Sequence, residues 1–552
     1  MRRDLALLFA LALVTRLAAA LVVDYPPYTD PAYYQLVGEQ LAAGRGFSVP
    51  VLWSFLEVGG RLPADPMLPV PSNGHWMPLT SIVAAGSIAV VGDLLGSWRA
   101  AQLPMVLIGA ALVPFTHYIA VDLWGSRFNG WIAALLVLAA GPLLVMAPLV
   151  DAFAVFGATG AAAIWSSMRA VRAPRPGPWL VAAGACVGLA TLARVDGLLL
   201  GVAPAVAWAV RRDWSSWPAR VGWGIASFAA ALLILAPWMA RDLAVFGSPF
   251  PSAGGHTLWI TSYNQQFSIA QDPSLGQYLA WGAGNIIGSK LAAWSELIGR
   301  TAVLLGGIFI LPFGYGLWRE RRRTELQPLL AYFAVMFLAM GAVFTLHAPK
   351  GAFYHSSLAW LPFAAALAVA NLAPAASAGG RAWPFLRRPA THRFLAVAGL
   401  AGAFALSLAG SAVLIGQWLD AHARLRQAAD FLVDRGAQSA VVMAYDPAAL
   451  HALSGNPGVA PPFDPFPVIG RVVDAYDVQW VVVTLPPGET RDPLGLWDGA
   501  SATDSAGNHP DFLPAAPDYD AAGVRVFRVV REGGPPRSST SGARSTVDPM
   551  HL

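Results

Sequence analysis

Long apolar stretches separated by short polar segments recur along most of the chain. Most of them approach the roughly 20 residues that a helix needs to cross the hydrocarbon core of a bilayer. They occupy residues 5–23, 78–95, 101–121, 129–150, 152–168, 179–193, 197–210, 221–240, 301–318, 327–346, 354–372 and 394–417. This pattern predicts an α-helical protein that crosses a membrane many times.

The pattern changes after residue 419. Residues 420–435 predict a helix, whereas 439–444 and 478–485 read as short buried strands, and 524–530 alternates valine with polar residues as a strand does. We therefore predict a membrane domain over 1–419, followed by a small α/β domain outside the membrane over 420–531. Residues 532–552 are rich in Gly, Pro and Ser and predict a disordered tail.

The arginines between the apolar stretches orient the chain, because positively charged loops stay in the cytoplasm. If residues 78–95 crossed the membrane, every later basic cluster would lie on the opposite side from Arg2 and Arg3. We therefore expect 78–95 to lie on the membrane surface or to re-enter it, which leaves about eleven spans. The long loop 24–100 then lies outside. The basic clusters are Arg2/Arg3, Arg127, Arg169/Arg172/Arg175, Arg211/Arg212/Arg220, Arg319/Arg321/Arg322/Arg323 and Arg381/Arg387/Arg388/Arg393.

Composition narrows the class of protein. Only 12% of the residues are charged, about half of the roughly 25% typical of soluble domains. The single cysteine, Cys186, excludes an intrachain disulfide and a cysteine-based metal cluster. The net charge of +4 comes from arginines that flank spans, so we predict no nucleic-acid partner. Abundant Ala and Gly, with lysine only at 290 and 350, indicate a bacterial protein, and hence the plasma membrane.

The first outer loop opens with a candidate site residue, Asp30, directly before Pro31. An acidic residue followed by proline is a typical start of a helix, with the acid as its N-cap. The residues after it predict an amphipathic helix on the membrane surface, with one apolar face formed by Tyr33, Leu36, Val37 and Leu41. Asp30 either caps this helix or takes part in catalysis, and both interpretations remain open. Asp24, at the end of the first span, is a competing base.

Several short motifs occur together in this loop and after it. Asp30 is followed by Tyr33-Tyr34 and by Gly44-Arg45-Gly46-Phe47-Ser48, and a later helix begins at His75-Trp76-Met77-Pro78-Leu79. In this order the motifs resemble those of the GT-C superfamily of membrane glycosyltransferases, which includes protein O-mannosyltransferases and lipid A aminoarabinose transferases. Met77 stands where the family has a proline. In that family the helix after this motif does not cross the membrane.

Further positions along residues 1–420 are similar to the family. Arg99 precedes the second true span, and Asp151 occupies an acidic position at the outer end of the third. Residues 191–197 contain Arg194 and Asp196 in a Thr-Arg-x-Asp-Gly-like element. Residues 236–250 contain Arg241 in a Pro-Trp-x-x-Arg segment with Asp242 in place of the usual Asn. Residues 354–362 resemble a late Arg-Tyr…Pro element in which Phe353 replaces arginine and Lys350 is a candidate substitute.

The resemblance implies a glycosyltransferase that moves a sugar from a polyprenyl-phosphate donor to a glycan, lipid or protein acceptor on the outer face of the membrane. Asp30 would accept the acceptor's proton and Asp151 would support it. Cations would stabilise the departing phosphate, and a single displacement would invert the anomeric centre. The donor-binding candidates are Arg99, Arg194, Arg241, Lys350, His355 and Tyr354. Because the donor carries one phosphate, we predict no metal and no cofactor.

Other interpretations remain open. Arg194 and Asp196 are also suited to pairing at the tip of a hairpin, and Arg241 to anchoring a helix at the membrane interface. At the level of the whole chain, the alternatives are a membrane transporter or lipid flippase and an enzyme similar to an O-antigen ligase or polymerase. A transporter typically places ionisable groups near the bilayer midplane. Here they gather at the outer rim, which favours the transferase.

Overall fold

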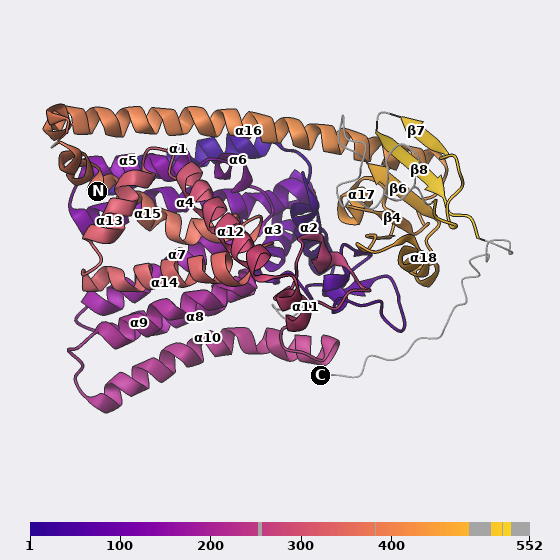
Figure 1. Cartoon of the computed structure of the whole chain (residues 1–552), viewed down its shortest axis with the longest axis horizontal. Coiled ribbons are helices and arrows are strands. Elements are labelled where there is room, and N and C mark those ends of the chain that lie inside the picture. The colour runs from indigo at the N-terminus through magenta and orange to yellow at the C-terminus, as the bar shows by residue number, and fades with distance from the viewer. Residues whose placement is uncertain (252–256, 381, 485–508, 522, 532–552) are drawn as a thin grey trace.

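The computed structural model describes residues 1–251, 257–380, 382–484, 509–521 and 523–531. Its long helices lie side by side in one body, and a mixed α/β unit sits at one end of them (Figure 1). The α-helices are α1 (Arg2–Val22), α2 (Thr29–Ala42), α3 (Leu79–Leu95), α4 (Ser97–Trp124), α5 (Arg127–Leu138), α6 (Leu143–Met146), α7 (Ala152–Arg172), α8 (Pro176–Ala193), α9 (Val202–Val210), α10 (Trp217–Phe246), α11 (Leu275–Ala280), α12 (Ala283–Leu304), α13 (Ile310–Arg319), α14 (Gln327–Leu338), α15 (Ala352–Gly379), α16 (Pro389–Asp434), α17 (Pro447–Ser454) and α18 (Phe466–Ala475).

Seven helical segments within the described ranges are long and apolar enough to cross a membrane: α1, α4, α8, α10, α15, α16 and residues 324–343. Shorter apolar helices are α3, α5 and residues 195–210. Some predicted spans are interrupted, because residues 129–150 divide into α5 and α6, and the chain turns at Gly306 and Gly307, both of positive φ. The polytopic helical architecture is confirmed, and the figure of about eleven spans stays a prediction.

Helices α1 and α4 are antiparallel, which fixes the course of α3 between them. Near the start of α1, Asp4 forms a bidentate ion pair with Arg127, which follows α4 (2.7 and 2.8 Å). Near the other end of α1, Arg99 at the start of α4 donates to the carbonyl oxygen of Val23 (3.2 Å). The segment between residues 23 and 97 therefore begins and ends at the same end of the bundle. This course agrees with the arginine argument that α3 does not cross, which stays a prediction.

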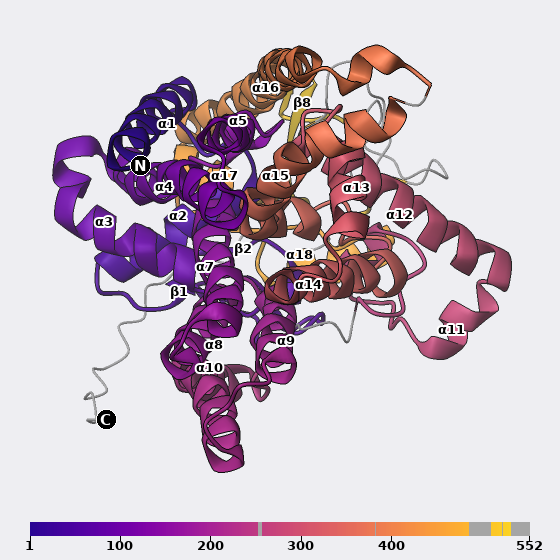
Figure 2. The ribbon, with the colours of Figure 1, turned by 90° about the vertical axis from the view of Figure 1, so that its left-hand side faces the viewer.

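Several predicted cytoplasmic arginines meet at the opposite end of the bundle from the α/β unit. Arg172 pairs with Asp122 near the end of α4. Arg323 donates to the carbonyl oxygen of Leu123 (3.3 Å), so it lies at the same end. Figure 2 looks along the helices from this end, where the N-terminus lies. Because basic loops stay in the cytoplasm, this arrangement agrees with an outer location of the α/β unit, which stays a prediction.

The α/β unit contains a six-stranded sheet in the order β2-β5-β4-β6-β8-β7. Strands β2, β5, β4 and β6 run parallel, and β8 and β7 join antiparallel. The strands are β2 (Val51–Leu52), β4 (Val442–Ala444), β5 (Gly458–Val459), β6 (Trp480–Thr484), β7 (Tyr519–Ala521) and β8 (Val524–Arg528), while β1 (Ser48–Val49) and β3 (Val70–Pro71) form a separate pair. We call this sheet with α17 and α18 the outer unit.

One edge strand of the outer unit comes from the first outer loop. The amide of Gly458 donates to the carbonyl oxygen of Pro50 (3.2 Å), and the amide of Ala460 donates to that of Leu52 (2.8 Å). Helix α16 also runs without a break through residue 419. The predicted division between 1–419 and 420–531 is therefore bridged twice, and the outer unit is built from both parts of the chain.

Helix α2 packs differently from its prediction. Its side chains Tyr33, Leu36 and Val37 are buried in a core shared with the outer unit, alongside Val442 and Ala448. The apolar face predicted to lie on lipid is thus covered by protein. The reason is that β2 brings the sheet directly over the loop that carries α2.

Candidate active site

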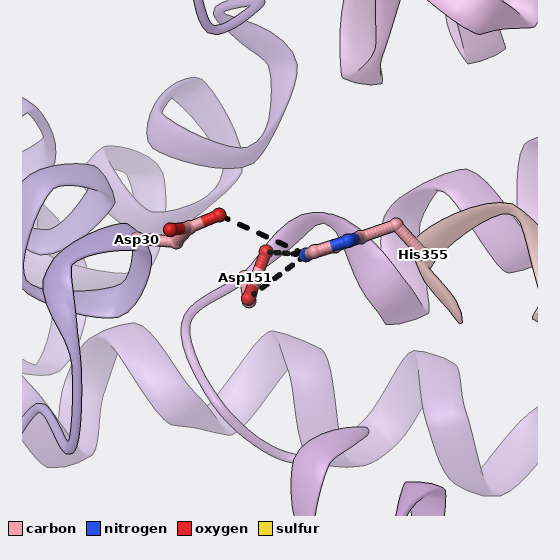
Figure 3. Close-up of side chains that lie close together, drawn as sticks. All are labelled: Asp30, Asp151 and His355. Atoms are coloured by element: carbon pink, nitrogen blue, oxygen red, sulfur yellow. Dashed lines mark hydrogen bonds and ion pairs between the residues drawn. The ribbon is translucent and has the colours of Figure 1, made fainter. Parts of the chain in front are cut away.

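Asp30 does not cap a helix. Helix α2 begins at Thr29, its N-cap is Tyr28, and no side chain caps it. Asp30 is therefore the second helical residue, and its carboxylate is directed at His355 in α15 (Figure 3). Of the two interpretations that the sequence left open, the cap is wrong.

Three side chains from distant elements meet at this point. Asp151 caps α7, where its Oδ1 accepts from the amide of Ala152 (2.5 Å), and its Oδ2 accepts from the hydroxyl of Tyr28 (2.8 Å). The Nε2 atom of His355 lies 3.1 Å from Oδ1 of Asp151 and 3.8 Å from Oδ2 of Asp30. The imidazole stacks on Phe153, with ring centroids 4.1 Å apart. These contacts fix the plane of the histidine ring.

The hydrogen-bond partners of His355 favour one arrangement of its protons. Its Nδ1 lies 3.1 Å from the carbonyl oxygen of Gly351, which only accepts, so Nδ1 carries a hydrogen. Its Nε2 faces the carboxylates of Asp30 and Asp151, and a lone pair there would be repelled. With a hydrogen on Nε2 that bonds to Asp151, the ring is an imidazolium between two carboxylates. In this form His355 carries a proton in addition to any that Asp30 and Asp151 bind.

The environment sets the affinity of Asp30 for a proton. Burial and the negative charge of Asp151 raise the pKa of Asp30 to about 7, against the opposing charges of His355 and Arg194. A carboxylate with a pKa near neutrality is suited to accept a proton from a substrate and to release it again. Asp151 is fully buried and engaged by three donors, so it is the structural partner of the pair.

Arg194 lies at the tip between α8 and α9 and lines the same cavity as Asp30 and His355. Its Nε donates to Oδ1 of Asp196 (2.9 Å), and Asp196 also accepts from the hydroxyl of Ser356 in α15. The predicted hairpin pair therefore exists. Because the outer edge of the guanidinium is not used by this pair, Arg194 can hold the tip and still face a ligand.

Two adjoining cavities surround Arg194. The first, of about 490 Å³, lies above the cluster, and its lining includes Tyr28, Asp30, Trp53, Tyr263, Tyr445, Pro461 and His355. The second, of about 380 Å³, is mostly apolar, and its lining includes Met77, Leu198, Leu199, Phe250, Met340 and Phe344. Both are lined by His75, Trp76, Arg194, Gln266, His347 and Ala352. Apolar atoms form most of the surface of both cavities, and the first has the larger polar share. For this difference we call them the polar cavity and the apolar cavity.

The cluster and Arg194 unite four of the predicted site residues, namely Asp30, Asp151, Arg194 and His355. The structure places the other four elsewhere. Arg99 donates to the carbonyl oxygens of Ala20 and Val23 at the end of α1. Arg241 donates to that of Ser72 (2.7 Å) and pairs with Asp242 (2.9 Å). These two arginines hold the first outer loop against the bundle.

Lys350 and Tyr354 also lie outside the linings of both cavities. The amine of Lys350 is exposed and lies 4.6 Å from the ring centroid of Tyr263, at the rim of the polar cavity. The ring of Tyr354 lies under the guanidinium of Arg300, 4.4 Å away, and so faces another partner. Tyr263 and the two histidines His75 and His347 line the polar cavity instead.

Sequence reasoning missed most of the cavity wall. Trp53, His347 and Tyr445 lie in segments without a motif, and only the fold brings them to Asp30. His75 and Trp76 belong to the His75–Leu79 motif, which was the one available signal for them.

The same three side chains are spaced for a metal ion. Asp30, Asp151 and His355 each offer one ligand atom, and these atoms lie within 4.8 Å of one another. Two carboxylates and an imidazole suit a divalent cation such as Zn²⁺ or Mn²⁺. His355 would first have to give up its hydrogen on Nε2, because a metal ligand uses the neutral ring. The absence of a metal therefore stays a prediction.

No protein-family model matches the sequence, and no curated protein matches it. Among solved structures, the chain is similar to the archaeal oligosaccharyltransferase AglB from Archaeoglobus fulgidus in complex with an inhibitory peptide and a dolichol-phosphate. The TM-score is 0.52 at 14% identity, over 85% of this chain and 69% of that chain.

The chain is also similar to ArnT from Cupriavidus metallidurans bound to undecaprenyl phosphate, with a TM-score of 0.57 at 15% identity, over 96% of this chain and 99% of that chain. Both are GT-C membrane glycosyltransferases. The resemblance drawn from the motifs is thus confirmed at the level of the fold.

Proposed function

We propose that this protein is a glycosyltransferase that moves a sugar from a polyprenyl-phosphate donor to an acceptor at the outer face of a bacterial plasma membrane. The observation that carries the proposal is the position of Arg194 between the two cavities, with Asp30 and His355 in the polar one. An amphiphilic donor needs three environments in this order: an apolar cavity for the lipid, a cation for the phosphate, and a more polar cavity with a base for the sugar. AglB with dolichol-phosphate and ArnT with undecaprenyl phosphate, similar in fold, support a lipid-phosphate ligand.

The donor fits the site in one direction. Its lipid chain would lie in the apolar cavity, against Leu198, Leu199 and Phe344, and leave the protein toward the bilayer. Its phosphate would meet Arg194, whose charge favours the anion. Its sugar would then enter the polar cavity, next to Asp30. The acceptor would approach from the side of the outer unit, where Tyr445 and Pro461 line the same cavity.

The residues supply the parts of a single displacement. An acceptor oxygen or nitrogen attacks the anomeric carbon and gives its proton to Asp30, while the bond from that carbon to the phosphate oxygen breaks. The electron pair of that bond leaves with the polyprenyl phosphate, whose charge Arg194 stabilises. The imidazolium of His355 offsets the negative charge of Asp151 beside the base. Attack from the face opposite the phosphate inverts the anomeric configuration.

Deletion of the gene, with complementation by variants, tests the proposal without knowledge of the sugar. We expect the deletion strain to lose one glycoconjugate and to accumulate a polyprenyl-phosphate sugar, measured by mass spectrometry of glycans and lipids. The wild-type chain and Asp24→Asn restore the product. Asp30→Asn, at equal abundance in the membrane, does not, because removal of a general base costs about 10²–10⁴-fold in rate. Restoration by Asp30→Asn would remove Asp30 from the mechanism.

A further inference from the structure

The polar cavity has an aromatic wall that the proposed chemistry does not use. The rings of Trp53 and Trp76 are stacked, with centroids 3.8 Å apart and an interplanar angle of 5°. The ring of His75 lies 5.6 Å from that of Trp53. All three side chains are half-buried and line the same cavity as Asp30. We call Trp53, His75 and Trp76 the tryptophan wall.

A buried carboxylate holds this wall from behind. Glu57, in the 3₁₀-helix η1 (Phe55–Val58), has no solvent exposure. It accepts from the indole nitrogen of Trp53 (3.1 Å), from the amide of His75 (3.1 Å) and from the hydroxyl of Tyr33. Burying a charge is costly unless hydrogen bonds compensate for it, and here the compensating donors all belong to the wall or to its support. Glu57 therefore fixes the indole of Trp53 and the backbone of His75.

A second layer fixes Trp76. The amide of Asn73 donates to the hydroxyl of Tyr33 (2.6 Å), and its side-chain nitrogen donates to the carbonyl oxygen of Trp76 (3.0 Å). Asn73 adopts a left-handed conformation, with φ of 62°, which Asn tolerates better than most residues. The ring of Tyr33 meets Trp76 edge-on, with centroids 4.9 Å apart. The wall is thus preorganised before any ligand arrives.

The chemistry of the wall suits a sugar ring. Aromatic faces are electron-rich and attract the C–H groups on the apolar face of a sugar, and a few polar groups then set its orientation. Burial lowers the pKa of His75 to about 3, so its ring is neutral at physiological pH. Because the two indoles cover each other's inner faces, the wall offers the outer surface of this stack and one neutral imidazole beside Asp30, and no charge of its own.

We propose that the tryptophan wall binds the sugar ring of the donor, that this sugar is uncharged, and that Glu57 is a positioning residue for it. This inference rests on the proposed function, because the phosphate at Arg194 places the sugar in the polar cavity. Asp30 would then face the acceptor bound against the other side of the sugar.

The charges around the polar cavity support an uncharged sugar. Asp151 is engaged by His355 and Tyr28, and Asp196 by Arg194. Among the described residues that line the cavity, Asp30 is the single acidic side chain. The ammonium group of an amino sugar would pair with the carboxylate of Asp30, which must stay free to accept the acceptor's proton. The same ammonium group would be repelled by the positive charge of Arg194. A neutral sugar avoids both conflicts.

Binding measurements on the purified full-length protein in detergent test the wall. The probes are bare undecaprenyl phosphate, undecaprenyl-phosphate esters of mannose, glucose and galactose, and the ester of 4-amino-arabinose. The measured quantity is the sugar gain, which is the Kd of the bare lipid divided by the Kd of a sugar ester. For the neutral sugars, the ester that binds most tightly is used. We expect a gain above one for the wild type, and no gain for the amino sugar.

Substitutions in the wall should lower the gain. Trp53→Ala and Trp76→Ala each lower it by roughly three- to ten-fold, the order of one aromatic stacking contact. Trp53 lines the polar cavity and not the apolar one, so Trp53→Ala leaves the Kd of the bare lipid unchanged. Trp53→Phe retains part of the gain and shows that the protein is folded. Glu57→Gln lowers the gain because an amide presents hydrogens where the donors of Tyr33, Trp53 and His75 already point. Trp259→Ala, a half-buried outer tryptophan outside the cavity, changes neither value.

Each contrary result has a distinct meaning. If the wild type binds bare undecaprenyl phosphate no better than Arg194→Ala does, the proposed function fails, and the wall inference fails with it. If the bare lipid binds through Arg194 but the gain is absent, or survives in Trp53→Ala and Trp76→Ala, the wall does not bind the sugar and the proposed function stands. A larger gain for 4-amino-arabinose than for the neutral esters overturns the assignment of an uncharged sugar.

Discussion

The Nε2 atom of His355 stands between two carboxylates, 3.8 Å from Oδ2 of Asp30 and 3.1 Å from Oδ1 of Asp151. The two acids differ in their surroundings. Asp151 is fully buried and accepts three hydrogen bonds, whereas the side chain of Asp30 is one-quarter exposed, toward the polar cavity. This asymmetry assigns them different roles in the proposed reaction, with Asp151 holding the imidazolium and Asp30 exchanging protons with substrates.

The pH dependence of turnover should report the ionisation of Asp30. Burial and Asp151 raise its pKa to about 7, and a base acts only when ionised. We therefore expect kcat/KM to rise about tenfold per pH unit below pH 7 and to level off above it, as measured in membranes of the complemented strain. A rate that stays constant from pH 5 to pH 8 would show that Asp30 does not titrate in the reaction.

Substitution of Asp446, at the start of α17, should shift the rising limb of the pH profile, which is the pH range in which kcat/KM increases. It caps α17 through the amide of Ala449 (3.0 Å), and its negative charge contributes to the raised pKa of Asp30. Asp446→Asn keeps the cap, since Asn is an equally good N-cap, and removes the charge. The rising limb should shift to lower pH. Asp434→Asn, which neutralises an exposed acid at the end of α16, should leave the limb unchanged.

Arg194 should be needed for the lipid phosphate. A hydrogen bond to a charged group contributes about 1.5–3 kcal/mol, so Arg194→Ala should weaken binding of undecaprenyl phosphate by roughly ten- to a hundred-fold. Asp196→Asn removes the pairing partner and keeps the arginine, and it should bind the lipid as the wild type does. If both variants give less protein but the purified protein binds undecaprenyl phosphate with the wild-type Kd, the role of Arg194 is to stabilise the hairpin and not to bind the lipid.

Arg241 should matter for stability and not for the donor. It joins α10 to the first outer loop through Ser72 and pairs with the buried Asp242. Arg241→Ala should lower the free energy of unfolding by about 1–3 kcal/mol, because it leaves Asp242 without its partner, and thermal unfolding in detergent would show this as a lower Tm. Arg45→Ala, an exposed arginine of the same loop, should not lower the Tm. A weaker Kd for undecaprenyl phosphate with an unchanged Tm would place Arg241 in the donor site.

Chelation should leave turnover intact. The imidazolium form of His355 competes with a metal for the same Nε2 atom, so we expect equal rates before and after dialysis against EDTA. Loss of activity that Mg²⁺ or Mn²⁺ restores would instead make Asp30, Asp151 and His355 the ligands of a catalytic metal.

The sequence predicted the parts of the fold that depend on local pattern. Hydropathy predicted the long helices, because apolar helices are a physical requirement of the bilayer. The arginine distribution predicted that α3 does not cross, and the antiparallel course of α1 and α4 agrees with it. Strand β2 was not predicted. It has two residues, Val51 and Leu52, and its partner lies four hundred residues away in sequence, at Gly458 and Val459. No periodicity can arise in so short a segment.

The candidate site was predicted in its charged centre and not in its walls. Asp30, Asp151, Arg194 and His355 lie near the ends of apolar stretches, where an ionisable residue is conspicuous. Glu57 lies in an irregular loop, and nothing local shows that its carboxylate faces Trp53 and Tyr33. The position of such groups depends on contacts between distant segments, which one sequence does not display.

The interleaving of β2 with the outer unit constrains the order in which the protein is assembled during synthesis. Residues 51–52 leave the ribosome long before their neighbour strand at 458–459, so the loop that carries Asp30 has no strand partner on this side until that strand is made. The polar cavity is complete only once most of the polypeptide has been made, because Tyr445 and Pro461 belong to its lining. A product that terminates within α16 would retain Asp30 and Asp151 and still lack the part of the cavity lining that Tyr445 and Pro461 supply.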